Sequence, residues 1–279
     1  MTPYGLPPSC HRTGRPSGRA PTTTNSISLT PPPARSRRRS PPSPARRRRR
    51  PTPRRPAVTR TRRCWCSPTA ACLPAAGKIL WQHPVTAHVR GSAALDADGH
   101  LYVATLGGEV LSLTAEGKIR WQARARGQCD STPLLAGGCT LLVGCDDRTL
   151  TAFSTIDGRV KWRLYAPEGF RGGGALSPDG ATLYWGNLDR YLYAVSVESG
   201  KVRWRYRTAG RQMIPPLVDT AGRVLVFPEE KMLYLLDAEG TLAGTMVLPA
   251  IAEAHPAWID ERTLLLPLES GEILLFSGK

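Results

Sequence analysis

The first 76 residues lack lysine and acidic side chains altogether. They contain 17 arginines and 16 of the 26 prolines, while the rest of the chain holds 21 basic and 22 acidic residues. The formal net charge of +16 therefore belongs to the N-terminal segment alone. A segment so poor in large apolar residues buries too little surface to offset the entropy of ordering it. We predict a disordered, Arg/Pro/Ser-rich basic tail over 1–76 and a nearly neutral folded domain over 77–279.

Long apolar runs are also missing, since no stretch reaches the roughly 18 residues that a membrane-spanning helix needs. We therefore expect no transmembrane segment. Arg62 and Arg63 precede a short apolar stretch at 64–71, and residues 69–72 are similar to a bacterial lipoprotein cleavage box. This favours a bacterial periplasm or cell envelope as the location. A cytoplasmic protein, with a tail that arises from a misassigned start, is the alternative.

The cysteines and histidines lack the spacing of metal or redox motifs. Cys64 and Cys66 are separated by one residue, which fits neither a zinc knuckle nor a CxxC pair. Cys129, Cys139 and Cys145 fall close together, and we interpret them as small buried residues or incidental thiols. A disulfide among them requires an oxidising compartment. The five histidines are isolated from one another, at positions 11, 83, 88, 100 and 255.

A five-residue phrase, Gly-x-x-x-Trp, recurs through the remaining sequence. A fixed period of 40–42 residues separates its copies and indicates a repeat architecture. The fifth copy has lost its tryptophan. The copies occupy residues 77–81, 117–121, 158–162, 200–204 and 240–244.

Each repeat contains three further runs that are typical of strands. A stretch of small residues or proline is followed by a β-branched or aromatic run and then by an alternating run, as at 173–176, 183–186 and 192–195. Asp-Gly and Ser-Gly turns separate the runs, and no 3.6-residue period is present. Four strands per repeat are typical of a propeller blade. We predict an all-β fold, a β-propeller of about five four-stranded antiparallel blades over 77–279.

The repeats resemble those of the PQQ-like β-propeller family. The nearest copy is Leu183-Tyr184-Trp185-Gly186, continued by residues 187–195 and by the phrase at 199–204. The likeness covers 77–279 and is specific for fold, but the family includes quinoprotein dehydrogenases, BamB-like outer-membrane assembly factors and scaffold domains. The resemblance implies that four tryptophans wedge between adjacent blades. These are Trp81, Trp121, Trp162 and Trp204.

The strand count makes a prediction about closure. The phrase at 78–82 is a fourth strand without its own blade, and the last repeat ends after its third strand. Pairing of 78–82 with 272–276 would complete a closed ring of five blades and hide the sheet edges. The alternative is an arc that belongs to a longer ring.

The resemblance does not extend to quinone chemistry. The chain lacks the adjacent Cys-Cys pair of many alcohol-oxidising members. Asn187 and Asp189, candidates for a calcium site, fall in an ordinary inter-strand turn that favours these residues for local hydrogen bonds. We predict no enzyme activity, no bound PQQ, no metal site and no catalytic residue. The alternative is a truncated remnant or subdomain of a PQQ-dependent dehydrogenase or another large propeller protein.

Propellers usually bind through the loops of one face. The fourth-to-first and second-to-third strand connections share a face here, and arginines gather there. We predict a non-enzymatic scaffold that holds a protein or peptide partner, as in BamB-like proteins. Nucleic acid would bind only incidentally, through the arginine-rich tail, because no aromatics alternate with the arginines. The residues predicted to contact the partner are Arg90, Asp130, Arg171, Arg190, Arg211 and Gln212.

Overall fold

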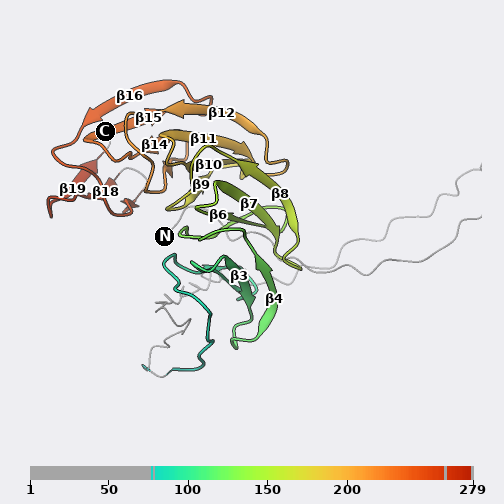
Figure 1. The fold of residues 1–279 in the computed structure, drawn as a ribbon. Coiled ribbons are helices and arrows are strands. Elements are labelled where there is room, and N and C mark those ends of the chain that lie inside the picture. Colours follow the sequence, from blue (N-terminus) through green and yellow to red (C-terminus); the bar gives the residue numbers. More distant parts are fainter. Residues whose placement is uncertain (1–76, 78, 261–262, 278–279) are drawn as a thin grey trace, which may run out of the picture. The chain divides into compact units, whose positions relative to one another are not determined.

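The described part of the chain is built from strands. The computed structural model describes residues 77, 79–260 and 263–277, all within one compact unit, so the tail predicted over 1–76 and its export signal lie outside them. The strands form five antiparallel sheets that follow one another in sequence order (Figure 1). Among these residues no helix has the length and apolar character needed to cross a membrane. The predicted all-β fold of four-stranded antiparallel sheets is confirmed.

Four of the sheets have four strands, and the fifth has three in the described residues. Within each sheet, strands that are consecutive in sequence pair with one another. The strands are β1 (Ala94–Leu95), β2 (Leu101–Ala104), β3 (Glu109–Leu113), β4 (Ile119–Arg124), β5 (Leu134–Ala136), β6 (Thr140–Gly144), β7 (Thr149–Ser154), β8 (Val160–Tyr165), β9 (Gly174–Leu176), β10 (Thr182–Gly186), β11 (Tyr191–Ser196), β12 (Val202–Arg207), β13 (Leu217–Val218), β14 (Val224–Val226), β15 (Met232–Leu236), β16 (Leu242–Val247), β17 (Ala257–Trp258), β18 (Thr263–Pro267) and β19 (Ile273–Ser277).

Burial differs systematically across each sheet. The second strands β2, β6 and β10 are buried along their whole length, which explains why they are apolar apart from the first residues of β6 and β10, Thr140 and Thr182. The fourth strands β8 and β12 instead mix exposed and half-buried residues and carry most of the charge. Each sheet therefore covers its neighbours with its inner strands and presents its fourth strand to solvent.

An indole joins each of the first three sheets to the next, and a fourth indole, Trp81, lies on the first sheet in the same way. The ring nitrogens of four tryptophans donate to backbone carbonyls of the following sheet: Trp81 to Ala115 (2.8 Å), Trp121 to Thr155, Trp162 to Val197 and Trp204 to Ala238 (each 2.9 Å). Each indole also lies against the glycine that opens the next phrase. All four of these glycines have a left-handed φ between 71° and 84°, and a Cβ on any of them would lie 2.5–2.6 Å from the indole.

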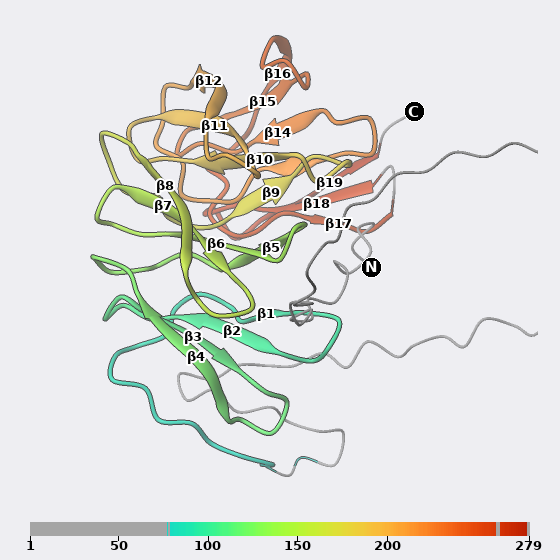
Figure 2. The same cartoon turned by 90° about the vertical axis from the view of Figure 1, so that its right-hand side faces the viewer.

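The first strands of the first four sheets, β1, β5, β9 and β13, contact one another in that order, and Figure 2 shows β1, β5 and β9. Ser131 and Gly172 form a parallel bridge, and the Thr132 amide donates to the Gly172 carbonyl at 2.8 Å. A side chain at Gly172 would collide with the backbone carbonyl of Met213. The small residues that precede the first strands therefore permit close backbone approach from sheet to sheet.

The predicted pairing of 78–82 with 272–276 is wrong in the described residues. Residues 79–82 form no strand, and β19 pairs only with β18. Trp81 nevertheless lies on the first sheet in the same way as the other three tryptophans lie on their neighbours.

The residue that would face Trp81 in this pairing is larger than those that face the other tryptophans. Where a fourth strand carries a tryptophan, the residue opposite it on the third strand is small: Ser112, Ala152 or Ala194. In the fourth sheet Gly244 replaces the tryptophan, and the opposite residue is Leu235. Leu275 occupies this position in the fifth sheet, so pairing would force its side chain against the Trp81 indole.

Candidate functional site

The two sets of loops on the proposed binding face are tied together by a repeated hydrogen bond. In every sheet, an amide of the second-to-third strand turn donates to a carbonyl of the connection that enters the first strand. The two sets therefore lie on one face, here called the loop face. The bonds are Leu106 to His88 (2.8 Å), Asp146 to Gln128 (2.7 Å), Leu188 to Gly169 (3.1 Å), Glu229 to Arg211 (2.8 Å) and Glu269 to Ile251 (2.9 Å).

Arginines and carboxylates alternate across the loop face. Arg90 pairs with Asp130 at 3.1 Å. Arg171 makes a bidentate pair with Asp146, with Nε and a terminal nitrogen at 2.7 and 2.9 Å from the two oxygens. The hydrogen bond to Asp146 raises the pKa of Arg171, and the negative charge of Asp130 adds to this effect. The four residues thus form a row of alternating charge across the first three sheets.

The third predicted arginine has its own partner. Arg211 Nε lies 2.7 Å from Glu229 Oε2, and the Arg211 side chain is about half exposed. Three of the four arginines predicted to contact the partner, Arg90, Arg171 and Arg211, are therefore ion-paired. A carboxylate ligand would have to compete with, or bridge between, existing pairs.

Arg148 and Arg190 occupy equivalent turns in a left-handed backbone conformation, with φ of 68° and 73°. The equivalent turn of the first sheet has Gly108, which adopts this conformation without strain. In each case the carbonyl accepts an amide from the following connection: Ala166 bonds to Arg148 and Thr208 to Arg190. Both arginine side chains are exposed and form no ion pair with any residue that the structure describes.

Gln212 lies beneath this surface. Its side chain is 1 % exposed, and its amide nitrogen donates to Thr208 Oγ1 at 2.6 Å. A Cβ at Gly186 would collide with the Gln212 side chain, so the two backbones approach closely here. The structure places Gln212 as a support for the loop that carries Arg211.

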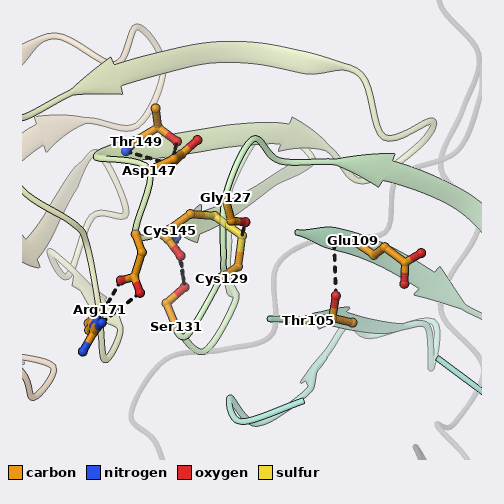
Figure 3. The surroundings of a disulfide bond; sticks show 11 residues. Thr105, Glu109, Gly127, Cys129, Ser131, Cys145, Asp147, Thr149 and Arg171 are labelled. Carbon is orange, nitrogen blue, oxygen red and sulfur yellow. Dashed lines mark hydrogen bonds and ion pairs between the residues drawn. A yellow bond between two sulfur atoms is a disulfide. The ribbon is translucent and has the colours of Figure 1, made fainter. Parts of the chain in front are cut away.

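A disulfide joins the two loop sets in the second sheet (Figure 3). Cys129 and Cys145 are both fully buried, and 16 residues of sequence separate them. They lie directly beside the bond from Asp146 to Gln128, and Ser131 Oγ closes the same region by donating to the Gly144 carbonyl at 2.7 Å. These two cysteines are buried, as expected, but they form the disulfide that the sequence left open and are not free thiols.

The side chains of the calcium-site candidates, Asn187 and Asp189, already form hydrogen bonds with neighbouring residues. Asn187 Nδ2 donates to the Glu168 carbonyl at 2.8 Å, and Asn187 Oδ1 accepts the Asp189 amide at 2.9 Å. Asp189 accepts the Tyr191 amide and, at 2.5 Å, the Tyr193 hydroxyl. Burial, together with this bond, raises the pKa of Tyr193. This donor set does not fit a quinone–metal site.

The first sheet gathers a small group that the sequence did not reveal. Ligand atoms of Asp96, Asp98 and His100 lie within 4.8 Å of one another in the β1–β2 turn. Asp96 already accepts the His100 amide, the His100 ring and the Tyr102 hydroxyl at 2.8–2.9 Å. Burial raises the pKa of Asp96, but these hydrogen bonds outweigh it and the pKa is lowered. The group stabilises its own turn.

A cavity of about 390 Å³ lies away from the loop face, between the second and third sheets. Lys161 reaches it and donates to the Gly138 carbonyl and to Thr140 Oγ1, while Arg203 donates to the Ala181 carbonyl. Burial lowers the pKa of Lys161. Because both cations bond to protein acceptors, this cavity is a weaker candidate than the loop face.

Comparison with known proteins decides the family. The profile of the family described as "Outer membrane protein assembly factor BamB" matches residues 69–243 and 166–273. The chain belongs to this BamB-like family of PQQ-like β-propellers. A BamB-like curated relative, the outer membrane protein assembly factor BamB of Bordetella pertussis, is 32% identical over 92 residues. That match covers 33% of this chain and 23% of the relative, so it spans about a quarter of the relative's length.

One of two similar solved structures shares the fold closely enough for a comparison. A computationally designed protein, Ika8, matches with a TM-score of 0.62 at 10% identity and covers 73% of this chain and 63% of its own. BamB from Moraxella catarrhalis matches with a TM-score of 0.47 at 15% identity, over 73% of this chain and 87% of its own. At these identities the likeness to the designed protein concerns the fold alone.

Proposed function

We propose that this chain is a non-enzymatic scaffold that holds a protein or peptide partner on its loop face, in the bacterial cell envelope. The observation that carries the proposal is the pair of exposed arginines, Arg148 and Arg190, held at strained backbone positions where glycine would be more stable. A residue kept at such a position at a cost in stability indicates a role for its side chain. Their guanidinium groups offer bidentate hydrogen bonds to carboxylates.

The neighbouring ion pairs support a partner of mixed charge. The row formed by Arg90, Asp130, Arg171 and Asp146 presents both signs of charge. A partner segment with alternating acidic and basic residues would match this row, whereas a purely acidic segment would meet Asp130 and Asp146. We therefore narrow the partner to a polar segment of mixed charge that supplies carboxylates to Arg148 and Arg190.

The disulfide supports an envelope location. Buried disulfides persist in oxidising compartments such as the periplasm and are rare in the cytosol. The family relationship supports the same location, because the curated relative is an outer membrane protein assembly factor. We propose that the partner of this chain belongs to an outer-membrane assembly machinery.

The absence of enzyme activity is part of the proposal. The side chains of Asn187 and Asp189 already form hydrogen bonds within and around their own turn. Their oxygen atoms are therefore poorly placed to hold a metal and a quinone. Adding PQQ with calcium to the full chain should produce neither an absorbance change nor dye-linked alcohol oxidation.

Arg148→Gly combined with Arg190→Gly provides the sharpest test. Glycine relieves the left-handed strain, so each change should raise the free energy of unfolding by about 1 kcal/mol while removing the binding group. Tagged full-length chain should capture a partner from detergent-solubilised outer membranes of its source bacterium, and the variant should lose it. Capture is quantified by mass spectrometry, and stability by urea denaturation.

Arg159→Ala combined with Arg223→Ala is the matched control, because it removes two exposed arginines from turns outside the loop face. This control should retain the partner. Equal capture by the native chain, the double glycine variant and the control would contradict the assignment of the loop face. Loss of the partner from the control alone would mean that binding occurs elsewhere.

A further inference from the structure

Charge within the described strands gathers on the fourth strands of the first three sheets. β4, β8 and β12 carry two, two and three cations and no acidic residue. The other described strands contain one charged residue among them, Glu109 on β3. Residues 77–279 as a whole hold 21 basic and 22 acidic residues, so cations are concentrated on these strands of a nearly neutral domain.

The three strands are neighbours in space. Trp121 on β4 lies against Gly158, just before β8, and Trp162 on β8 lies against Gly200, just before β12. Figure 1 shows β4, β8 and β12 in this order along one side of the sheets. Their cations therefore contribute to one surface.

Four arginines share one side of these strands. Side chains alternate along a strand, so the residues one and three places after each tryptophan point away from the sheet that its indole covers. These six positions hold a glutamine, a tyrosine and four arginines. They are Gln122 and Arg124 on β4, Arg163 and Tyr165 on β8, and Arg205 and Arg207 on β12. The four arginines are here called the arginine band.

A β-bulge adds an apolar row to the same side. The register shifts just before each of these tryptophans, which returns the first residue of the strand to the side of the arginine band. These first residues are Ile119, Val160 and Val202, which are 48%, 40% and 40% exposed. Together with Tyr165, which is 59% exposed, they make this side of the strands amphipathic.

The arginine band has no acidic partner among the residues that the structure describes. None of its guanidinium groups forms an ion pair there. Glu109 lies opposite Arg124 across β3 and β4, but it accepts a hydrogen bond from Gln122 at 3.3 Å. Arg205 lies over the Tyr191 ring, 4.8 Å from its centroid. The positive charge of the band is therefore left unbalanced.

Protection of a sheet edge does not account for the arginine band. Cations on an edge strand hinder pairing with other chains, yet β16 is also an exposed edge strand and has no charged residue. Thr245 and Val247 occupy the positions of the band there. Residues 1–76 cannot supply the missing negative charge either, because they contain 17 arginines and no acidic residue. A partner that complements the band is anionic and comes from outside these parts of the chain.

We propose that the arginine band docks on an anionic phospholipid surface, with its guanidinium groups on the lipid phosphates. Guanidinium groups form bidentate hydrogen bonds to phosphate, whereas lysine acts only as a point charge, and all four members of the band are arginine. This inference does not depend on the proposed function of the loop face.

A lipid surface fits the band better than an acidic protein does. Lipids move laterally, so their headgroups can reach cations that are spread over three strands, whereas a folded partner would have to present its carboxylates at fixed places. The apolar row and Tyr165 would meet the boundary between headgroups and acyl chains, where tyrosine is enriched. An acidic polypeptide offers no such boundary.

Binding of the full chain to phosphatidylglycerol vesicles, with phosphatidylcholine vesicles for comparison, tests the proposal. A variant with Arg124→Gln, Arg163→Gln and Arg207→Gln removes one arginine from each strand. Its partition coefficient should fall by at least about tenfold, because each basic residue near an anionic surface contributes roughly fivefold. These side chains form no hydrogen bond or ion pair within the described residues, so the variant should keep the native unfolding midpoint. Lysine at the same three positions should recover most of the binding.

The matched control combines Arg90→Gln, Arg211→Gln and Arg223→Gln. It lowers the net charge by the same amount, but its three positions lie outside the arginine band. The control should bind vesicles like the native chain. Residues 1–76 are the same in all of these chains, so their own attraction to the vesicles cancels in the comparison.

Hydrogen exchange with and without the vesicles locates the contact. Amides of β8 and β12 should become protected, while those of β16 should not. Equal losses of binding in the band variant and the control, or no added protection of β8 and β12, would overturn the proposal. Stronger protection of β8 and β12 by soluble polyglutamate than by the vesicles would assign the band to an acidic polypeptide and would overturn it too.

Discussion

The glycine and the tryptophan of the repeated phrase contact each other, but from neighbouring copies. The Trp162 ring nitrogen bonds to the Val197 carbonyl at 2.9 Å, and the same indole lies where a Cβ of Gly200 would be. Gly200 is also left-handed, with φ of 71°. One residue position therefore requires glycine for two reasons, its backbone conformation and the space that the indole occupies.

Replacing Trp162 by Ala should lower the free energy of unfolding by about 3–5 kcal/mol, because a large side chain is removed from a seam that cannot close fully. Gly200→Ala should also destabilise the fold, because the new Cβ would collide with the Trp162 indole and because alanine disfavours the left-handed backbone. Urea denaturation of the two single variants and the double variant should show that Gly200→Ala costs less when Trp162 is absent.

Gly180→Ala is the control for this cycle. Gly180 has a similar φ of 69°, but a Cβ at this position would meet no other atom within 4 Å. The substitution therefore reports the backbone strain alone, about 1–2 kcal/mol. Equal costs for Gly200→Ala in the presence and absence of Trp162 would contradict the contact between phrase copies.

Sequence reasoning reached some of these residues and missed others. The tryptophans stood out because they recur at a fixed period. The burial of Gln212 and the ion pairs of Arg171 and Arg211 could not be predicted, because they depend on how loops from adjacent strands fold toward one another. The left-handed conformation of Arg148 and Arg190 was also hidden, since arginine gives no sign of it in a sequence.

At the scale of elements, strands and loops differ in how directly the sequence encodes them. The almost entirely apolar β6 and β10 and the alternating third strands were predictable, because burial on two faces or on one leaves a plain pattern. Residues 79–82 carry the same pattern as β4, yet form no strand. A strand needs a neighbouring strand to pair with. The strand expected here was β19, whose Leu275 would face Trp81 and lies almost two hundred residues away in the sequence.

The disulfide makes the two loop sets of the second sheet into one element. Replacing Cys129 and Cys145 together by Ala should lower the free energy of unfolding by about 3 kcal/mol, since the bond closes a loop of 16 residues of sequence separation. Alanine is preferred to serine because both positions are fully buried.

Chemical denaturation of the native chain and the double variant measures this loss. The variant should retain the strand signature of the native circular dichroism spectrum. An unchanged free energy of unfolding would mean that the hydrogen bonds of Asp146 and Ser131 hold the loops without the covalent link.

At the scale of the molecule, each sheet depends chiefly on its immediate neighbours. The second and third sheets have a neighbouring sheet on both sides in the described residues, whereas the outer face of the fifth exposes Ile273 and Leu275. Stability in such arrays is a sum of unit and neighbour contributions, so the last unit is expected to open first.

Hydrogen exchange followed by mass spectrometry of the native chain should show this gradient. Amides of β18 and β19 should exchange faster than those of β6, β7, β10 and β11. Uniform exchange across the five sheets would indicate one cooperative unit and contradict the neighbour-by-neighbour account.

The uniform seam has an evolutionary consequence. Four of the five copies of the phrase bring an indole donor, and each of these indoles meets a carbonyl and a glycine of the following sheet, so the contacts that they make are built alike. A gene for such a chain should tolerate the gain or loss of a whole tryptophan-bearing unit by recombination between copies, because the new junction is built from the same parts as the old.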